Sequence, residues 1–157
     1  MEKVYIYLEN GTFLEAKSFG ANGTTTGEIV FTSGGTEADN LVLNSAVRDL
    51  GVTKIITSKI EHHAVLHTVE ALKKDYNINV AYVNVNGAGD IDLNHLSVLL
   101  DTNETSLVSL MHVNNEIGNI LDIKRVADLC KLNNALFHSD AVQSVGHYPL
   151  DLQNIQV

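Results

Sequence analysis

The sequence predicts an α/β protein with a mainly parallel sheet and helices on both faces of that sheet. Short apolar runs typical of buried strands alternate with stretches whose apolar residues recur every three or four positions, as on one face of a helix. The 157 residues are 45% hydrophobic and 18% charged, which is typical of a soluble domain with one core. Polar clusters also follow several strand candidates directly, and such sheets bind ligands beyond the carboxyl ends of their strands.

The first residues are predicted to form a separate short β unit. The alternating stretches 4–8 and 12–16 flank Asn10-Gly11, which is a strong hairpin turn signal. The residues that follow are rich in Gly, Thr and Asn and show no helical period. We therefore expect a short β segment over residues 1–27 and an α/β domain over residues 28–157.

From residue 28 the sequence alternates between strand and helix patterns. The strand candidates are residues 28–32, 54–57, 79–85, 106–111 and 135–138. The helix candidates between them are residues 36–50, 63–76, 93–100 and 123–133. Asp92 and Asp122 stand just ahead of two of these helices, where a carboxylate caps free N–H groups and favours the helix dipole. Strands that alternate with helices in this way indicate a parallel sheet covered on both faces.

Charge and composition exclude several classes of function. The net charge is −9 and the Lys and Arg residues are scattered, whereas nucleic-acid binding needs a basic surface. No apolar run is long enough to span a bilayer and no charged, apolar leader opens the chain, so we expect a cytoplasmic protein without a membrane partner. The single cysteine, Cys130, shares a predicted helical face with Ile123 and Val126, which favours a buried structural thiol over a nucleophile.

A glycine-rich turn between the first strand candidate and the first helix candidate is a candidate phosphate site. Residues 32–40 read Thr-Ser-Gly-Gly-Thr-Glu-Ala-Asp-Asn, and Gly35 and Thr36 fall where the helix begins. A helix N-terminus offers unpaired N–H groups and a partial positive charge, and glycines let a ligand approach the backbone closely. The alternative is an ordinary strand–helix turn with Thr36 as its N-cap.

Asp140 and Gln143 form a second candidate pair. Asp140 follows the short strand candidate at residues 135–138, where a carboxylate can pair with a ligand cation such as a protonated pyridine nitrogen. Gln143, three residues further on, can face the same ligand. The alternatives are that Asp140 caps the turn that follows and that Gln143 completes a capping box.

His62 and Asn115 complete the candidate site, because each follows another strand candidate. His62 can lie over an aromatic ligand or move protons, and the alternative is a surface or capping histidine. Asn115 can fix a ring substituent of a ligand, and the alternative is a turn held by Asn side chains. His63 and His67 share a helix face and permit a metal pair, but no third ligand has suitable spacing, so we expect no metal.

Four segments carry these clusters. They are Ser-Gly-Gly-Thr-Glu within residues 28–40, Glu-His-His within residues 55–66, His-Val-Asn-Asn-Glu within residues 108–118 and His-Ser-Asp-Ala-Val-Gln within residues 138–146. Together they resemble the cysteine desulfurases, which are pyridoxal 5′-phosphate enzymes related to class V aminotransferases. The resemblance covers residues 28–157 and implies only the N-terminal part of the family's cofactor domain. It implies pyridoxal phosphate as the cofactor and L-cysteine as the substrate, which becomes L-alanine while its sulfur passes to an enzyme-bound persulfide.

The resemblance also implies a role for each candidate residue. Gly35 and Thr36 would hold the phosphate of the cofactor. His62 would stack on the pyridine ring and assist proton transfer as a catalytic residue. Asp140 would pair with the pyridinium nitrogen and keep it protonated. The side of the ring that carries the phenolic oxygen would be contacted by Asn115 and Gln143.

The resemblance implies partners as well. The parent family is dimeric, so we expect self-association through apolar surface that the missing parts would leave exposed. Sulfur acceptors are further partners, and the sequence leaves open whether they serve iron–sulfur cluster assembly, tRNA thiolation or another purpose.

Two departures from the family pattern bear on activity. The family's cofactor-binding lysine follows in a Ser-x-His-Lys segment, and here no lysine occurs after Lys131. The family's sulfur-accepting cysteine lies on a later loop, which Cys130 does not match. We therefore expect a truncated cofactor-binding domain that is inactive alone, unless another chain supplies the lysine. The alternative is a non-enzymatic folded remnant or interaction domain of a fused gene.

The opening residues have a second resemblance. Residues 4–31 resemble the N-terminal β domain of the small subunit of carbamoyl-phosphate synthetase, and this match ends where the desulfurase match begins. We therefore expect a chimera of two gene fragments with a junction near residues 28–31. No amidotransferase activity is expected, because the glutaminase half of that subunit has no counterpart in the sequence.

Overall fold

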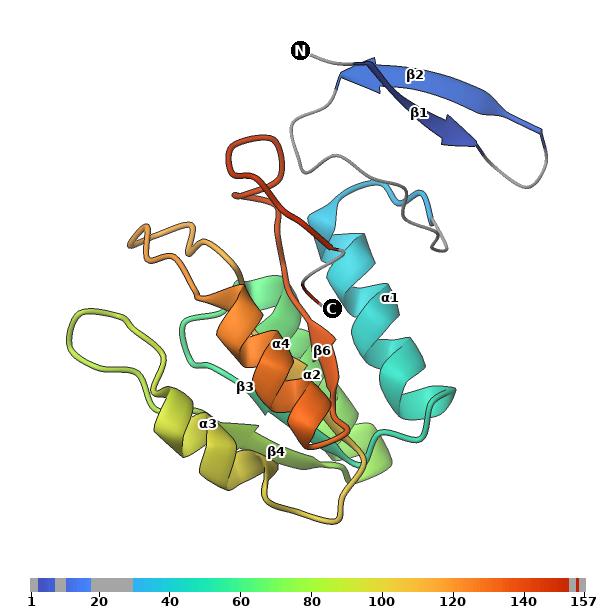
Figure 1. The fold of residues 1–157 in the computed structure, drawn as a ribbon. Helices are drawn as coiled ribbons and strands as arrows, with labels where there is room; N and C mark the ends of the chain where they lie inside the picture. The colour runs from blue at the N-terminus through green and yellow to red at the C-terminus, as the bar shows by residue number, and fades with distance from the viewer. Residues whose placement is uncertain (1–2, 8–10, 18–29, 153–154, 156–157) are drawn as a thin grey trace.

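The protein folds into an antiparallel hairpin and a four-stranded parallel sheet flanked by helices (Figure 1). The structure is a computed structural model that describes residues 3–7, 11–17, 30–152 and 155. The strands of the parallel sheet stand in the order β4-β3-β5-β6, and the α/β class predicted from the sequence is confirmed. The described elements in chain order are β1 (Lys3–Tyr7), β2 (Phe13–Lys17), α1 (Gly35–Arg48), β3 (Lys54–Thr57), α2 (His63–Tyr76), β4 (Asn79–Tyr82), α3 (Leu93–Leu100), β5 (Ser106–Ser109), α4 (Ile123–Leu132) and β6 (Leu136–His138).

The hairpin of β1 and β2 is drawn apart from the parallel sheet (Figure 1). Its register pairs Tyr5 with Glu15, and the rings of Tyr5 and Phe13 stack with their centroids 5.1 Å apart. Both strands of the predicted hairpin therefore occur, with their bounds shifted by one residue. The turns predicted after β2, and the expected boundary at residue 27, lie outside the described residues.

The carboxyl ends of the central strands finish in register. Thr57 of β3 aligns with Ser109 of β5, and Ser109 aligns with His138 of β6. Every residue of β3 and of β5 is buried, as expected for parallel strands that are covered on both faces. The segments that leave these three strands therefore begin side by side along one edge of the sheet.

Each face of the sheet is covered by its own pair of helices. Ile55 and Leu107 belong to a core cluster that also contains the buried apolar residues of α1 and α2. The next residues along the same strands, Ile56 and Val108, belong to a second cluster with the buried residues of α3 and α4. Because successive side chains of a strand point to opposite faces, this alternation places one helical layer on each side of the sheet.

Carboxylates cap α3 and α4, as predicted. Asp92 accepts hydrogen bonds from the backbone N–H groups of Asn94 and His95, both at 3.0 Å. Asp122 accepts one from the N–H of Arg125 at 3.1 Å. Such a cap typically stabilises a protein by about 1 kcal/mol, and both helices begin where the sequence predicts.

One predicted strand does not occur in the described residues. Residues 30–32 are not in a strand, and the first two residues of the candidate at 28–32 lie outside the described ranges. Val30 and Phe31 are 61% and 73% exposed, although their apolar run predicted burial. A strand needs a neighbour for its backbone N–H and C=O groups, and no described strand pairs with this segment.

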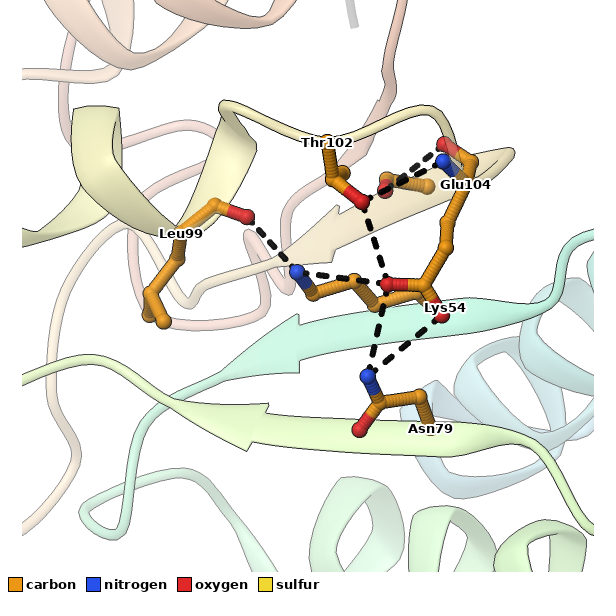
Figure 2. Close-up of polar contacts among 6 residues, drawn as sticks. Lys54, Asn79, Leu99, Thr102 and Glu104 are labelled. Carbon is orange, nitrogen blue, oxygen red and sulfur yellow. Dashed lines mark hydrogen bonds and ion pairs between the residues drawn. The ribbon is translucent and has the colours of Figure 1, made fainter.

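A buried lysine ties the strands together at the amino end of the sheet (Figure 2). The Nζ of Lys54 donates to the carbonyl oxygen of Leu99 at 2.8 Å and lies 3.5 Å from Oε2 of Glu104. Glu104 also accepts hydrogen bonds from the side chains of Asn79 and Thr102. These contacts join β3 and β4 to the segment between α3 and β5, and they give the buried ammonium group both a carbonyl and a carboxylate partner.

Candidate functional site

The segments that follow β3, β5 and β6 join the start of α1 around a cavity of about 220 Å³, which we call the carboxyl-edge cavity. Its wall contains all six residues that the sequence singled out and three others. The six predicted residues are Gly35, Thr36, His62, Asn115, Asp140 and Gln143. The three others are Asp39, Met111 and Val142.

The start of α1 offers backbone donors at one side of this cavity. The N-cap is Gly34, which has no side chain to cap the helix, so Thr36 lies within the first turn and is not the cap. The first N–H groups of a helix have no partner within the helix. A Cβ added to Gly35 would lie 2.6 Å from Cγ2 of Val142, so any other residue here would force the exposed Val142 side chain to move. The arrangement suits an anion that approaches the backbone.

Asp140 lies just beyond β6, in the turn that leads to Val142. Its Oδ1 accepts a hydrogen bond from the N–H of Val142 at 2.9 Å, so it holds this turn, as the capping alternative predicted. Its carbonyl oxygen accepts from the N–H of His112 at 2.9 Å, which fixes the turn to the segment after β5. Within the described ranges Oδ2 accepts no hydrogen bond, so one carboxylate oxygen remains for a ligand donor.

His62 is both the N-cap of α2 and part of the cavity wall. Its Nδ1 accepts a hydrogen bond from the N–H of Ala64 at 3.1 Å. Because Nδ1 acts as an acceptor, the proton of the neutral ring belongs on Nε2. The His62 side chain therefore caps α2 and also faces the cavity, so both interpretations of this residue apply.

Of the two neighbouring asparagines, one holds the turn and the other faces the cavity. Asn114 is buried and holds the turn, because its Oδ1 accepts from the N–H groups of Glu116 and Ile117 and its Nδ2 donates to the carbonyl of Ile60 at 2.7 Å. Asn115 is exposed at the cavity, where its Nδ2 donates to Oε1 of Glu116 at 2.9 Å. The side chain that reaches the cavity is therefore the predicted one.

Asp39 is a cavity residue that the sequence analysis missed. It is only 4% exposed, and its Oδ1 lies 3.5 Å from Nε2 of His138. Nδ1 of the same ring lies 3.0 Å from the hydroxyl of Ser109. The sequence offered one indication of this residue. Asp39 stands one helical turn before Leu43, on the buried face of α1, and charged residues are rarely buried unless they have a partner.

Glu61 belongs to the quoted Glu-His-His segment but was given no role. Its Oε1 accepts from the hydroxyl of Ser58 at 2.7 Å, and its Oε2 accepts from the N–H of Met111 at 2.9 Å. Burial raises the pKa of this carboxyl to about 7, against the lowering effect of the two hydrogen bonds, and the nearby charges of Asp140 and Asp39 raise it further. A carboxyl group with such a pKa beside a cavity is typical of functional sites.

Three buried polar atoms in the described part of the chain have no hydrogen-bond partner, and all three lie at this edge of the sheet. They are Oγ1 of Thr57 at the end of β3, Nδ1 of His112 beyond β5 and Oγ of Ser139 beyond β6. Burial also lowers the pKa of His112, which favours its neutral ring. Unpartnered buried atoms are uncommon in proteins, and their concentration here indicates an edge that is not optimised for stability.

A second cavity, of about 190 Å³, adjoins the first, because Met111 lines both. Its wall includes Glu61, Asn114, Asp90 and Asp122. The two aspartates already have partners, since Asp90 accepts from asparagine side chains and Asp122 caps α4. The polar groups of this second cavity therefore serve internal contacts.

The alternative metal site gains no support. The rings of His63 and His67 stack with their centroids 5.3 Å apart, and no three His, Cys, Asp or Glu side chains gather as metal ligands in the ranges that the structure describes. Cys130 is buried, and burial raises the pKa of its thiol to about 12, as expected for a structural cysteine. None of the described helices is both long and apolar enough to cross a membrane.

Comparison with known proteins supplies the family. The class V aminotransferase family matches residues 17–157, so the match begins within the segment assigned to the β unit. Cysteine desulfurase IscS of Clostridium botulinum (strain Kyoto / Type A2) is 45% identical over 133 residues, which are 83% of this chain and 33% of that protein. The solved structure of a NifS-like protein has a TM-score of 0.73 and 38% identity over 80% of this chain and 35% of its own. The structure described as SspA in complex with cysteine has a TM-score of 0.72 and 30% identity over 78% and 35%.

These matches cover most of the chain, whereas the chain spans about a third of the length of the curated relatives. The resemblance of residues 4–31 to the carbamoyl-phosphate synthetase subunit, and the junction near residues 28–31, stay predictions. The predicted family is confirmed: the chain belongs to the class V aminotransferases and, within them, is similar to the cysteine desulfurases.

Proposed function

We propose that the carboxyl-edge cavity binds pyridoxal phosphate and that the chain forms part of the cofactor domain of a cysteine desulfurase. The observation that carries this proposal is the convergence of six predicted residues, from four separate segments, on one cavity. Together they supply a helix N-terminus, a carboxylate, a histidine and two amides, which complement a phosphorylated pyridine ring.

The groups around the cavity fit the chemistry of this cofactor. A phosphate dianion complements the free N–H groups at the start of α1 and the hydroxyl of Thr36. The Oδ2 of Asp140 is available to accept a hydrogen bond from a pyridinium N–H. The side-chain amides of Asn115 and Gln143 can donate to the phenolic oxygen.

Bound pyridoxal phosphate supplies an electron sink for the bonds at the Cα of an amino acid. Asp140 holds a proton at the ring nitrogen, which maintains that property. His62, with Nδ1 engaged by its own helix, holds or moves a proton at Nε2. The apolar side chains of Met111 and Val142 exclude water from part of the wall.

L-Cysteine is the proposed substrate of the complete active site. The curated relatives are named cysteine desulfurases, and SspA, a structural neighbour, was solved with cysteine. We propose that these residues hold the cofactor through the contacts of the carboxyl-edge cavity, without a covalent bond. A cytoplasmic location, sulfur acceptors as partners and a part in iron–sulfur cluster assembly belong to the same proposal.

Self-association also belongs to the proposal. Val30, Phe31, Leu41 and Val42 are large apolar residues near the start of α1, and all four are exposed. Burial of such side chains favours association. Sedimentation of the purified chain as a monodisperse monomer would contradict this part.

The rival function is a folded remnant or interaction domain that binds no cofactor. Pyridoxal phosphate titrated into the chain, followed by visible circular dichroism, separates the two. We expect an induced band in the wild type, and in Asp140→Ala a weakening of affinity by about 10- to 100-fold, since a charge-assisted hydrogen bond is lost. Asp128→Ala, which removes an exposed carboxylate on α4, is the matched control and should bind as the wild type does.

Borohydride reduction and mass measurement complete this experiment. An induced band without covalent mass supports non-covalent binding. Covalent mass at one specific lysine would overturn the proposal that these residues bind the cofactor non-covalently. Identical titrations for wild type and Asp140→Ala, or no band in either, would favour the rival function.

A further inference from the structure

Two hydrogen bonds link the turn that carries His62 to the segment that follows β5. Oε2 of Glu61 accepts from the N–H of Met111 at 2.9 Å, and Nδ2 of Asn114 donates to the carbonyl of Ile60 at 2.7 Å. His62 and Met111 both line the carboxyl-edge cavity. The Glu61 carboxyl group therefore connects the two segments that carry His62 and Met111 in the wall of the proposed cofactor site.

The same carboxyl group also orders the turn itself. The hydroxyl of Ser58 donates to Oε1 of Glu61 at 2.7 Å, and the N–H of Ile60 donates to that hydroxyl at 3.2 Å. Glu61 is 7% exposed, so neither contact is exchanged readily for water. Its position next to His62 in the chain means that a shift of this carboxyl would move the imidazole.

The surroundings of Glu61 are poor in positive charge. Two carboxylates, Asp39 on α1 and Asp140 beyond β6, raise its pKa further through their negative charge. Lys59 lies nearby in the sequence, but its Nζ sits 5.9 Å from the centre of the Tyr82 ring. The titratable groups recorded around Glu61 are Asp39 of α1, Asp140 after β6, and Asp90 and Asp122, which share the second cavity with it. His62, the N-cap of α2, is its neighbour in the chain, and His112 follows Met111.

Both protonation states of Glu61 can keep the two contacts. The ionised group accepts from Ser58 and from Met111. The protonated group can accept from the Met111 N–H on one oxygen and donate from the other to the Ser58 hydroxyl, which is also a possible acceptor. A glutamine side chain has the same shape and the same pattern, so Glu61→Gln keeps the contacts and removes only the charge.

We propose that Glu61 is a positioning residue of the cofactor site, which holds the His62 turn against the end of β5 and loses its proton when a cation pairs with Asp140. This inference rests on the proposed function, because the cation is the protonated ring nitrogen of pyridoxal phosphate. Pairing cancels the negative charge of Asp140, which otherwise opposes ionisation of Glu61. The released proton passes to solvent. The raised pKa of Glu61 supports this coupling, because it places the ionisation near neutral pH.

The coupling is tested by carbon NMR of the chain labelled at its glutamate carboxyl groups. The Glu61 signal is assigned by its absence from Glu61→Gln. We expect a midpoint near pH 7 without cofactor, and a midpoint lower by about one unit with saturating pyridoxal phosphate. Inorganic phosphate, which can occupy the start of α1 but brings no cation, should not lower the midpoint.

The same coupling predicts how affinity depends on pH. With a shift of about one unit, the affinity of the wild type for pyridoxal phosphate rises about fivefold between pH 6 and pH 8, relative to Glu61→Gln. The protonation of the free cofactor is the same in both experiments and cancels in this ratio. Glu70→Gln, which neutralises a partnered glutamate on the exposed face of α2, is the matched control and should follow the wild type.

Positioning is tested by the ring signals of His62 and by affinity. We expect Glu61→Ala to shift these signals and to weaken pyridoxal phosphate binding about tenfold at both pH values, whereas Glu61→Gln leaves the signals in place. Should Glu61→Ala not fold, the comparison of wild type with Glu61→Gln still decides the coupling.

Several results would overturn the inference. A midpoint near 4.5, or one that stays fixed while the cofactor band saturates, would remove the coupling. Unchanged His62 signals and unchanged affinity in Glu61→Ala would remove the positioning role. Absence of a cofactor band in every variant at both pH values would defeat the proposed function and the coupling together, whereas the His62 signals would still decide whether Glu61 positions that turn.

Discussion

The charged side chains at the two ends of the parallel sheet differ in their interaction partners. At the amino end, Lys54 has a carbonyl and a carboxylate partner, and Glu104 accepts from two further side chains (Figure 2). At the carboxyl end, the negative charges of Asp39 and Asp140 act on the carboxyl group of Glu61, and Nε2 of His138 lies 3.5 Å from Oδ1 of Asp39.

This difference separates a structural end of the sheet from a functional one. Buried charges are ordinarily paired, because an unpaired charge in a low dielectric is costly. The amino end follows this rule and therefore needs no ligand to explain it. At the carboxyl end three carboxyl groups lie among three unpartnered polar atoms, so a ligand that brings a cation would add positive charge beside these carboxyl groups.

The largest expected effect is the pH dependence that Glu61 gives to stability. Its pKa is about 7 in the folded chain and near the ordinary glutamate value of 4.5 in the unfolded chain, so the folded state binds the proton more tightly. Its stabilising contribution is therefore complete below pH 4.5 and is lost as pH rises through about 7. The free energy of unfolding should fall by roughly 2 to 3 kcal/mol between pH 5 and pH 8 from this group alone.

Urea unfolding of wild type and Glu61→Gln at pH 5 and pH 8 measures this effect. The difference between the two proteins isolates the contribution of Glu61 from that of the other ionisable groups, which are the same in both. The same pH dependence in both proteins would mean that ionisation of Glu61 does not destabilise the fold, and the two ends would then not differ in this respect.

The second effect concerns the amino end. Lys54→Met keeps the length of the side chain but leaves Leu99 and Glu104 without their donor, so we expect a loss of about 2 kcal/mol in the free energy of unfolding. Lys124→Met, which removes an exposed lysine from its pair with Asp128, should change it by at most about 0.5 kcal/mol.

The same Lys54→Met variant distinguishes the two ends by function. Its affinity for pyridoxal phosphate should equal that of the wild type, because the lysine lies at the opposite edge of the sheet from the cavity. A loss of affinity without a loss of stability would show that the two ends are coupled and that the comparison fails.

The fold was largely predictable because its signals are local. The bounds of α2 and α3 follow from apolar periodicity together with a capping residue and, for α2, the left-handed Asn77 at its end. Strand ends were harder, since β4 and β5 finish at Tyr82 and Ser109, before their apolar runs do. The exposed Val30 and Phe31 show why one strand was wrong: apolar character does not supply the neighbouring strand that pairing requires.

In the candidate site too, residues with a local sequence signal were predictable and residues defined by long-range contacts were not. Residues such as Gly35, His62 and Asp140 were found because they follow strand candidates, and parallel strands bring their carboxyl ends to one edge. Asp39 was missed because it lies on a helix, where only its burial and its proximity to His138 distinguish it. The role of Glu61 depends on the Met111 N–H, fifty positions further along the chain, and no local pattern encodes such a contact.

The smallest expected effect is the influence of two neighbouring aspartates on the ionisation of Glu61 at the carboxyl end. Asp140 and Asp39 both raise the pKa of Glu61 through their negative charge, and Asp140 has the larger influence. Asp140→Asn and Asp39→Asn keep the shapes of these side chains, so each should lower the midpoint of the Glu61 carboxyl signal, and Asp140→Asn should lower it more. Asp75→Asn, on the last turn of α2, should leave the midpoint unchanged. Equal midpoints in all of these proteins would mean that burial alone sets the ionisation of Glu61, and a cation at Asp140 would then have no charge through which to act on it.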